Sequence, residues 1–233
     1  MGDKNRFPTV QQESSSTVRL GERAVIDDGV TLGYPPARGE NHLLIIGPGA
    51  HIRSGTIIYS GSCIGRNLET GHNVVIREQN IIGDGLRIWG NSVIDYGCRI
   101  GNNVKIHSQV YVSQFTFVED DVFLAPGVIL ANDIHPGCPD SFECMEGPRI
   151  KKGAQIGINV SVLPRVVIGE HAVIGSGSVV TKDIPPGVVA YGNPAQAVCK
   201  VGDLICTTGR RDKPYSQFIE RIIGRTENAH TSS

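Results

Sequence analysis

An all-β solenoid, in which short strands coil around one continuous core, is the fold that the sequence predicts. The first observation is a column of large aliphatic residues at every sixth position. Between Ile46 and Leu130, fourteen of its fifteen members are Ile, Val or Leu, and Thr70 is the exception. A fixed short period of this kind is typical of repeats that stack to bury a shared core. A second inward position, four residues after the first, holds mostly small or β-branched residues, such as Ala50 and Val104. That spacing indicates short strands separated by turns.

Glycine directly follows the aliphatic column in many repeats, where a corner would need an unusual backbone angle. We therefore expect each repeat to supply one strand and one corner, with three repeats in each triangular coil. The uninterrupted repeats run from Ile46 to Leu130, and the period resumes from 150 to 183. A shorter run of the same period comes earlier, and the segment 33–45 after it is interpreted as a loop. That earlier run consists of Leu20, Ile26 and Leu32.

One solenoid domain, residues 18–183, is predicted, with additions at both ends. Residues 1–17 are polar and rich in Ser and Gln, which predicts a flexible arm. Residues 184–233 are interpreted as a C-terminal extension. Within it, 188–201 reads as a strand and a turn, and 214–224 predicts a short helix because apolar residues recur there at helical spacing. A polar tail follows.

The repeat fails at one place, and that place is where we expect the chemistry. Leu130 and Ile150 lie twenty residues apart, two more than a multiple of six. The segment 131–149 is therefore predicted to leave the stack as an excursion loop. In solenoids, insertions become loops on one face, and loops that a rigid scaffold positions often carry function.

Composition and charge exclude several classes of protein. A net charge of −1 gives no reason to expect a nucleic-acid partner or an anionic membrane surface. No apolar run approaches the length of a membrane span, and the N-terminus lacks the apolar centre of a signal peptide. The six cysteines contain no CxxC pair. A cytoplasmic protein with reduced thiols is the expectation.

Several segments have the form of family signatures. They are Asn132-Asp133-Ile134-His135-Pro136, GPRIKKGAQIG at 147–157, IGSGSVVTKDIPPG at 174–187, YGNPA at 191–195 and, upstream, TGHNVVIRE at 70–78. The first four resemble the hexapeptide-repeat acyltransferases, and the upstream segment looks like the branch associated with nucleotide-sugar and polysaccharide-precursor metabolism. The resemblance implies a left-handed parallel β-helix, use of acetyl-CoA as co-substrate, and a homotrimer with active sites at its subunit interfaces. Its acceptor would be a small molecule, an amino sugar nucleotide by preference.

His135 in the excursion loop is the candidate catalytic residue. Acyl transfer from a thioester to an amine or hydroxyl needs a base near neutral pKa, and histidine is suited to that role. In the family, a His-Pro in the extended loop supplies this base, and His135-Pro136 stands at the matching place. Asn132 is a second catalytic candidate, as a residue that orients the imidazole. Asp133, Glu143 and Glu146 are alternatives for that role. We expect direct transfer, because no Ser or Cys stands in the context of an activated nucleophile.

Two further groups of residues are binding candidates. His72, Asn73 and Arg77 are expected to line the acceptor site. For acetyl-CoA, small residues would allow the pantetheine arm to approach the corners, and the resemblance implies that lysines meet its phosphates. The role of Arg165, at a position where the family usually has glycine, stays open. The co-substrate candidates are Gly157, Gly175, Ser176, Lys182 and Lys200.

The first functional hypothesis is an N-acetyltransferase for the amine of a nucleotide-linked amino sugar, and an O-acetyltransferase is the runner-up. A γ-carbonic-anhydrase-like metalloenzyme would need three histidines, but Val112 stands where the third would be expected beside His72 and His107. A non-catalytic scaffold is the remaining alternative. Cys138 and Cys144 flank a short segment near His135, but their spacing matches no ordinary zinc motif. No metal is expected.

Overall fold

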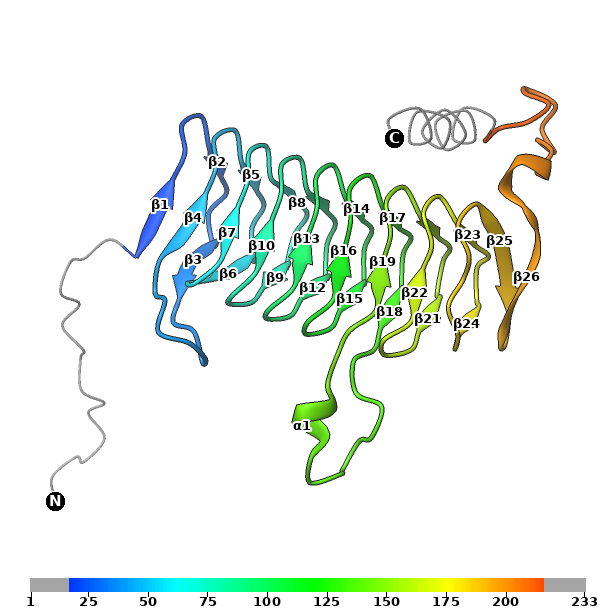
Figure 1. Ribbon diagram of the computed structural model, residues 1–233. Helices are drawn as coiled ribbons and strands as arrows, with labels where there is room; N and C mark the ends of the chain where they lie inside the picture. Colours follow the sequence, from blue (N-terminus) through cyan, green and yellow to red (C-terminus); the bar gives the residue numbers. More distant parts are fainter. Residues whose placement is uncertain (1–16, 216–233) are drawn as a thin grey trace, which may run out of the picture.

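The protein is a left-handed parallel β-helix, a triangular prism with a parallel sheet in each wall (Figure 1). The structure is a computed structural model and describes residues 17–215. The three sheets are termed A, B and C. Each repeat supplies one short strand and one corner, and three repeats complete a coil. Ile82, for example, pairs with Ile64 and Ile100, one coil to either side.

The strands follow one another from sheet A to sheet B to sheet C in every coil. Sheet A contains β1 (Val18–Leu20), β4 (Leu44–Ile46), β7 (Cys63–Ile64), β10 (Ile81–Ile82), β13 (Arg99–Ile100), β16 (Phe117–Val118), β19 (Arg149–Ile150) and β22 (Val167–Ile168). Sheet B contains β2 (Val25–Ile26), β5 (His51–Ile52), β8 (Glu69–Thr70), β11 (Arg87–Ile88), β14 (Lys105–Ile106), β17 (Phe123–Leu124), β20 (Gln155–Ile156), β23 (Val173–Ile174), β25 (Val188–Gly192) and β26 (Ala195–Lys200). Sheet C contains β3 (Thr31–Tyr34), β6 (Ile57–Tyr59), β9 (Val75–Ile76), β12 (Val93–Ile94), β15 (Tyr111–Val112), β18 (Ile129–Leu130), β21 (Ser161–Val162) and β24 (Val179–Val180).

The predicted inward positions form the core. Members of the aliphatic column from Ile46 onward are buried, and so are Ala50 and Val104 at the second inward position. Thr70, the polar exception, is 7% exposed, and its hydroxyl oxygen accepts the backbone N–H of Arg53 at 2.9 Å. Buried hydroxyls of this kind persist because they find hydrogen-bond partners.

The glycines after the aliphatic column are needed for close packing, and the expected unusual backbone angle is wrong for them. A Cβ at Gly47 would lie 2.7 Å from backbone atoms of Gly65 in the next coil. The positive φ angles fall two residues later in the corner, as at Gly49 and Asn67. Side chains with a short polar group tolerate that conformation, so this position does not require glycine.

Two insertions leave the prism from the same edge, the corner between sheets C and A. Leu20 pairs with Ile46, 26 residues later, where a regular coil takes 18. Val118 pairs with Ile150, 32 residues later. The first insertion lies between β3 and β4, inside the predicted 33–45 loop. The second is the predicted excursion loop, and it contains one helical turn, α1 (Ser141–Cys144).

The C-terminal end of the stack is closed by a hairpin. β25 continues sheet B in parallel, and β26 turns back antiparallel to it. A short 3₁₀ helix, Val201–Asp203, follows. The helix predicted over 214–224 lies almost wholly outside the described residues. Among residues 17–215, no helix has the length and apolar character to cross a membrane.

Candidate functional site

The excursion loop is a protrusion with a fixed neck. It extends away from the prism wall (Figure 1). At the neck, the Glu146 backbone N–H donates to the Asn132 carbonyl at 2.9 Å. The Arg165 guanidinium donates to the Cys144 carbonyl at 2.9 Å and lies 3.7 Å from the Glu146 carboxylate. Arg165, whose role the sequence left open, thus ties the next coil to the base of the loop.

His135 is exposed on this loop, and Asp133 orders the backbone around it. The Asp133 carboxylate accepts the Ser141 hydroxyl at 2.7 Å and the His135 backbone N–H at 2.9 Å. These two hydrogen bonds, that of Ser141 foremost, lower the pKa of Asp133. The imidazole itself makes no hydrogen bond to another residue of the described range. Asp133 therefore shapes the turn that presents His135.

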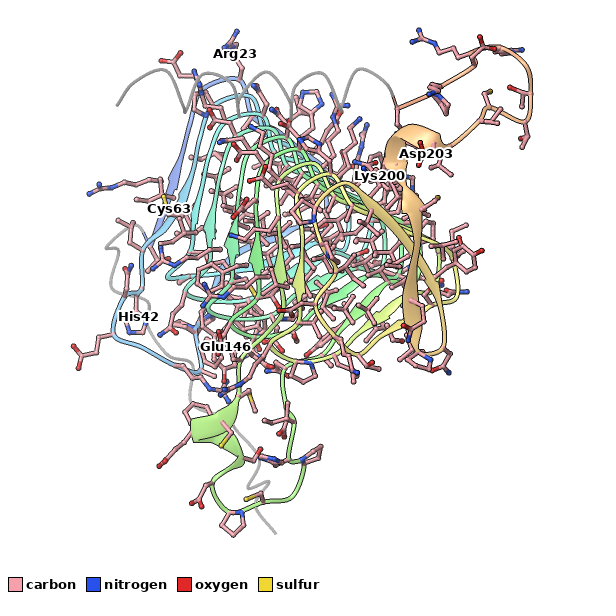
Figure 2. All side chains as sticks on the ribbon, turned by 45° about the vertical axis from the view of Figure 1, so that its right-hand side comes forward. Arg23, His42, Cys63, Glu146, Lys200 and Asp203 are labelled. Atoms are coloured by element: carbon pink, nitrogen blue, oxygen red, sulfur yellow. The ribbon has the colours of Figure 1, made fainter. Side chains whose placement is uncertain are left out.

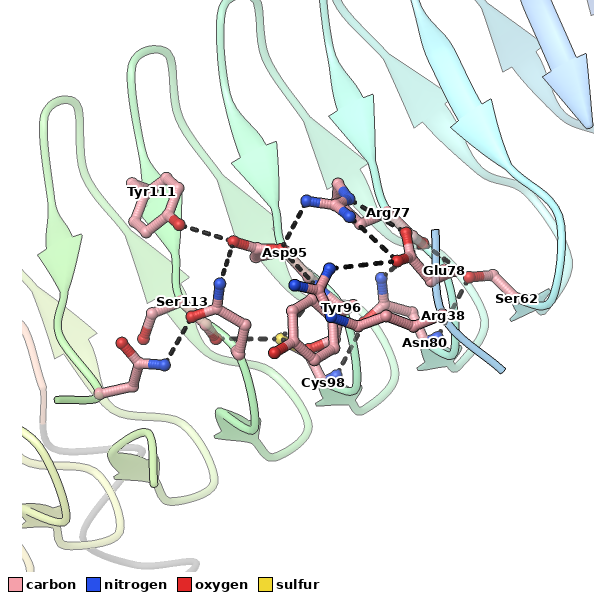
Figure 3. A network of polar contacts seen from close by, with 12 residues as sticks. Arg38, Ser62, Arg77, Glu78, Asn80, Asp95, Tyr96, Cys98, Tyr111 and Ser113 are labelled. Carbon is pink, nitrogen blue, oxygen red and sulfur yellow. Dashed lines mark hydrogen bonds and ion pairs between the residues drawn. The ribbon is translucent and has the colours of Figure 1, made fainter. Parts of the chain in front are cut away.

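Asn132 ends a hydrogen-bonded chain along the C–A corner that begins at Asp95, which Figure 3 labels. Its amide nitrogen donates to Gln114 Oε1 at 2.5 Å, and the Gln114 amide nitrogen donates to Asp95 Oδ2 at 2.6 Å. These three side chains, from three successive coils, are termed the amide relay. The relay links the neck of the excursion loop to a buried carboxylate inside the corner.

A buried ion pair, Arg77–Glu78, lies at the same corner, one coil further from the excursion loop than Asp95. Arg77 donates from Nε and Nη2 to the two carboxylate oxygens of Glu78, at 3.0 and 2.9 Å. The Glu78 side chain is 0% exposed, and Arg38 of the first insertion lies 3.8 Å from it. Burial alone would raise the pKa of Glu78, but the hydrogen bonds from Arg77 and the charges of both arginines lower it. Arg77 also approaches Asp95 at 3.5 Å, which joins this pair to the amide relay.

The expected acceptor residues lie at two different corners of one chain. His72 and Asn73 are exposed at the corner between sheets B and C, and the Ser54 hydroxyl lies 2.9 Å from His72 Nδ1. Arg77 lies beyond β9, at the C–A corner. The structure therefore does not bring the three side chains together within a single chain.

The expected co-substrate residues are also spread over the C-terminal coils. Gly157, Gly175 and Ser176 stack at the B–C corner, where a Cβ on Gly157 would lie 2.7 Å from the Ile174 carbonyl oxygen. These glycines are required by coil packing itself. Lys182 is exposed at the C–A corner, and Lys200 ends β26 at the far end of the prism (Figure 2).

Sequence reasoning missed Arg38, Asp95 and Gln114. One signal was available in the sequence. In many repeats glycine directly follows the aliphatic column, but at the C–A corner this position holds Arg77 in one coil and Asp95 in the next. Two opposite charges at the spacing of one coil predict an ion pair. Arg38 carried no such signal, because the first insertion sets its position.

The cysteines of the excursion loop are free thiols. Cys138 is exposed and Cys144 is partly buried. Within residues 17–215, no group of three or more His, Cys, Asp or Glu side chains is arranged to hold a metal ion.

Comparison with known proteins finds a matching family model and several acetyltransferases to which this chain is similar. Residues 81–114 and 147–182 match the model of the bacterial transferase hexapeptide (six repeats). A galactoside O-acetyltransferase from Lactococcus lactis subsp. lactis (strain IL1403) is 40% identical over 91 residues, 37% of this chain and 44% of that protein. A dTDP-3-amino-3,6-dideoxy-α-D-galactopyranose 3-N-acetyltransferase from Aneurinibacillus thermoaerophilus is 39% identical over 85 residues, 32% of this chain and 44% of that protein.

The chain thus spans less than half the length of these curated relatives. A crystal structure of a Bacillus cereus protein, provisionally assigned as an acetyltransferase, extends the likeness to the whole fold. It is 26% identical, covers 85% of this chain and 93% of its own, and has a TM-score of 0.52. The matched repeats lie on both sides of the excursion loop, in the coils that hold its neck. The chain is a left-handed β-helix, and residues 81–114 and 147–182 of it consist of bacterial transferase hexapeptide repeats.

Proposed function

We propose that this protein is an acetyl-CoA-dependent acyltransferase in which His135 acts as general base toward the amine of a nucleotide-linked amino sugar. The observation that carries the proposal is the excursion loop, which presents His135 outside the prism on an anchored neck. The matches to both an O- and an N-acetyltransferase support acyl transfer as the chemistry. The upstream segment 70–78 favours the amino sugar.

In the proposed reaction, the acceptor nitrogen forms a bond to the thioester carbonyl carbon as His135 removes a proton from that nitrogen. The carbon–sulfur bond then breaks, the thiolate leaves, and the proton passes to it from His135. Histidine can do both because it takes up and releases a proton near neutral pH. Gly177 offers open space at the B–C corner, where the thin pantetheine arm can lie beside Ser176.

A thiol-release assay with acetyl-CoA tests the reaction. The acceptor panel contains nucleotide-linked amino sugars, the corresponding sugars with hydroxyl in place of the amine, and simple galactosides. We expect thiol release with at least one amino sugar and at least about tenfold less with its hydroxyl counterpart. Release with hydroxyl acceptors alone would establish the O-acetyltransferase, which the Lactococcus match favours. Absence of thiol release with every acceptor would contradict the proposed reaction and favour a non-catalytic scaffold.

The proposed active form is a homotrimer, and the outward face of sheet C supplies part of its interface. Its strand positions carry no charge in the described residues, whereas the outward positions of sheets A and B include Arg, Lys and Glu. A long uncharged row of this kind marks an interaction surface, and a cyclic trimer buries two different patches of each copy. The row is Thr31, Ile57, Val75, Val93, Tyr111, Ile129, Ser161 and Val179.

Ile129→Asp is expected to convert the trimer to monomers, because it buries an unpaired carboxylate in the interface. Ile129 is 43% exposed in the single chain. Light scattering measures the mass in solution. Val25→Asp on the outward face of sheet B is the matched control, since Val25 is 50% exposed, and it should remain trimeric. A trimer that survives Ile129→Asp would place the interface on another face.

A further inference from the structure

The amide relay has a fixed direction, and Asp95 sets it. A carboxylate only accepts hydrogen bonds, so Gln114 must turn its NH₂ group toward Asp95 and its carbonyl oxygen away. Asn132 then meets a carbonyl oxygen, to which only its NH₂ group can donate. The Asn132 carbonyl oxygen, Oδ1, is left facing away from the relay. The orientation of both amides thus follows from the charge at Asp95, although nitrogen and oxygen are nearly alike in shape.

The side chain of Asp95 is surrounded by hydrogen-bond donors and one cation. It is 5% exposed, and its Oδ1 accepts the Tyr96 backbone N–H at 2.8 Å and lies 3.5 Å from Arg77. The Tyr111 hydroxyl donates to Oδ2 at 2.6 Å. Burial and this hydrogen bond raise the pKa of Tyr111, which keeps the phenol a donor. Each described polar group that contacts the carboxylate is therefore a donor, as a buried charge requires.

The relay ends where the proposed chemistry begins. Asn132 stands at the neck of the excursion loop, three positions before His135, and its backbone carbonyl is fixed by Glu146. A side-chain amide held at both its backbone and its NH₂ group has little freedom left. Its Oδ1 is a preorganised acceptor, which costs less ordering on binding than a mobile side chain would.

We propose that Asp95 and Gln114 are positioning residues for acyl transfer: they turn Asn132 so that its Oδ1 accepts a hydrogen bond from the attacking amine or hydroxyl. The inference rests on the proposed function and names a second contact to the nucleophile in the same site. A neutral carbonyl holds the nucleophile without competing with His135 for the proton that is removed.

Asp95→Asn should reverse the relay with almost no change of shape. The new amide keeps its oxygen toward Arg77 and the Tyr96 N–H, and it turns its NH₂ toward Gln114. Gln114 and Asn132 then turn over, so that Asn132 presents a donor to the nucleophile. We expect kcat/KM for the acceptor to fall about 10- to 100-fold, with the KM for acetyl-CoA within about twofold of wild type.

A second substitution should restore the acceptor atom. In Asp95→Asn/Asn132→Asp, the carboxylate stands at the loop end, accepts from Gln114 and presents its other oxygen to the nucleophile. Asn132→Asp alone leaves a carboxylate at each end of Gln114, whose single NH₂ can face only one of them. We therefore expect the double variant to exceed both single variants in kcat/KM by at least about fivefold. Asp84→Asn is the matched control, because it makes the same change at a carboxylate that pairs with Arg66 and lies outside the relay; near-wild-type kcat/KM is expected.

NMR of the side-chain amides measures the hydrogen-bond direction of the relay and does not depend on enzyme activity. The side-chain NH₂ signals of Asn132 should exchange slowly with water in the wild type and quickly in Asp95→Asn. Unchanged kcat/KM in Asp95→Asn, or a double variant no better than the single ones, overturns the positioning role while wild-type turnover stands. Absence of thiol release from the wild type overturns the proposed function and the role of Asn132 with it, and the NMR then reports the relay as structural only.

Discussion

We expect His135→Ala to lower turnover at least about 100-fold, the smallest loss that removal of a positioned general base usually causes. The proposed trimer and the affinity for acetyl-CoA should stay as in the wild type, because His135 is exposed and its side chain makes no hydrogen bond within the described residues. The backbone N–H that Asp133 accepts remains in the alanine variant. The excursion loop should therefore keep the turn that Asp133 orders, and the loss of activity should appear in kcat.

The measurement is steady-state thiol release at saturating acetyl-CoA, with light scattering and acetyl-CoA titration on the same preparations. His42→Ala is the matched control, since His42 is an exposed histidine on the other insertion from the same corner (Figure 2). It should keep wild-type turnover. Added imidazole should partly restore the His135→Ala variant, because a free base can enter the exposed site. Near-normal turnover of His135→Ala would remove His135 as the base.

The coil of the solenoid could be predicted from the sequence. The polar contacts of the candidate site, at the C–A corner, could not. The column from Ile46 predicts the inward face because burial of every sixth residue is a local consequence of the strand-and-corner geometry. The excursion loop follows from the same column, since Leu130 and Ile150 do not keep its phase. These two features are set by short-range spacing alone.

The polar contacts at the C–A corner depend on which residues the stacking brings together. Gln114 and Asn132 are ordinary amides in the sequence, and their relay exists only because each coil places them one above the other. Arg38 reaches Glu78 from an insertion whose path no period describes. The glycines show the same limit: Gly47 was expected to serve a turn, and the neighbouring coil is what excludes its side chain.

Glu78→Gln is the substitution with the largest expected effect on stability. It replaces a buried carboxylate with a neutral amide of the same shape. Arg77 and Arg38 then lose the negative charge that they share, and Arg77 keeps only its longer contact with Asp95. Breaking a buried ion pair by neutralising one member is strongly destabilising, so we expect the free energy of unfolding to fall by about 3 kcal/mol. The two hydrogen bonds from Arg77 are charge-assisted and lose strength with the carboxylate. Urea unfolding at neutral pH measures the change.

Glu69→Gln is the matched control. Glu69 pairs with Arg87 at 2.8 Å, but both side chains are more than half exposed, so its loss should cost less than about 1 kcal/mol. The pH dependence separates the two pairs further. Because the fold lowers the pKa of Glu78, its stabilising effect is complete above the ordinary value of 4.5 and is lost as the pH falls through the lowered value. The difference between wild type and Glu78→Gln should therefore shrink in acid. Equal costs for the two substitutions at neutral pH would mean that Glu78 contributes no more than a surface charge, and that the first insertion is held by other contacts.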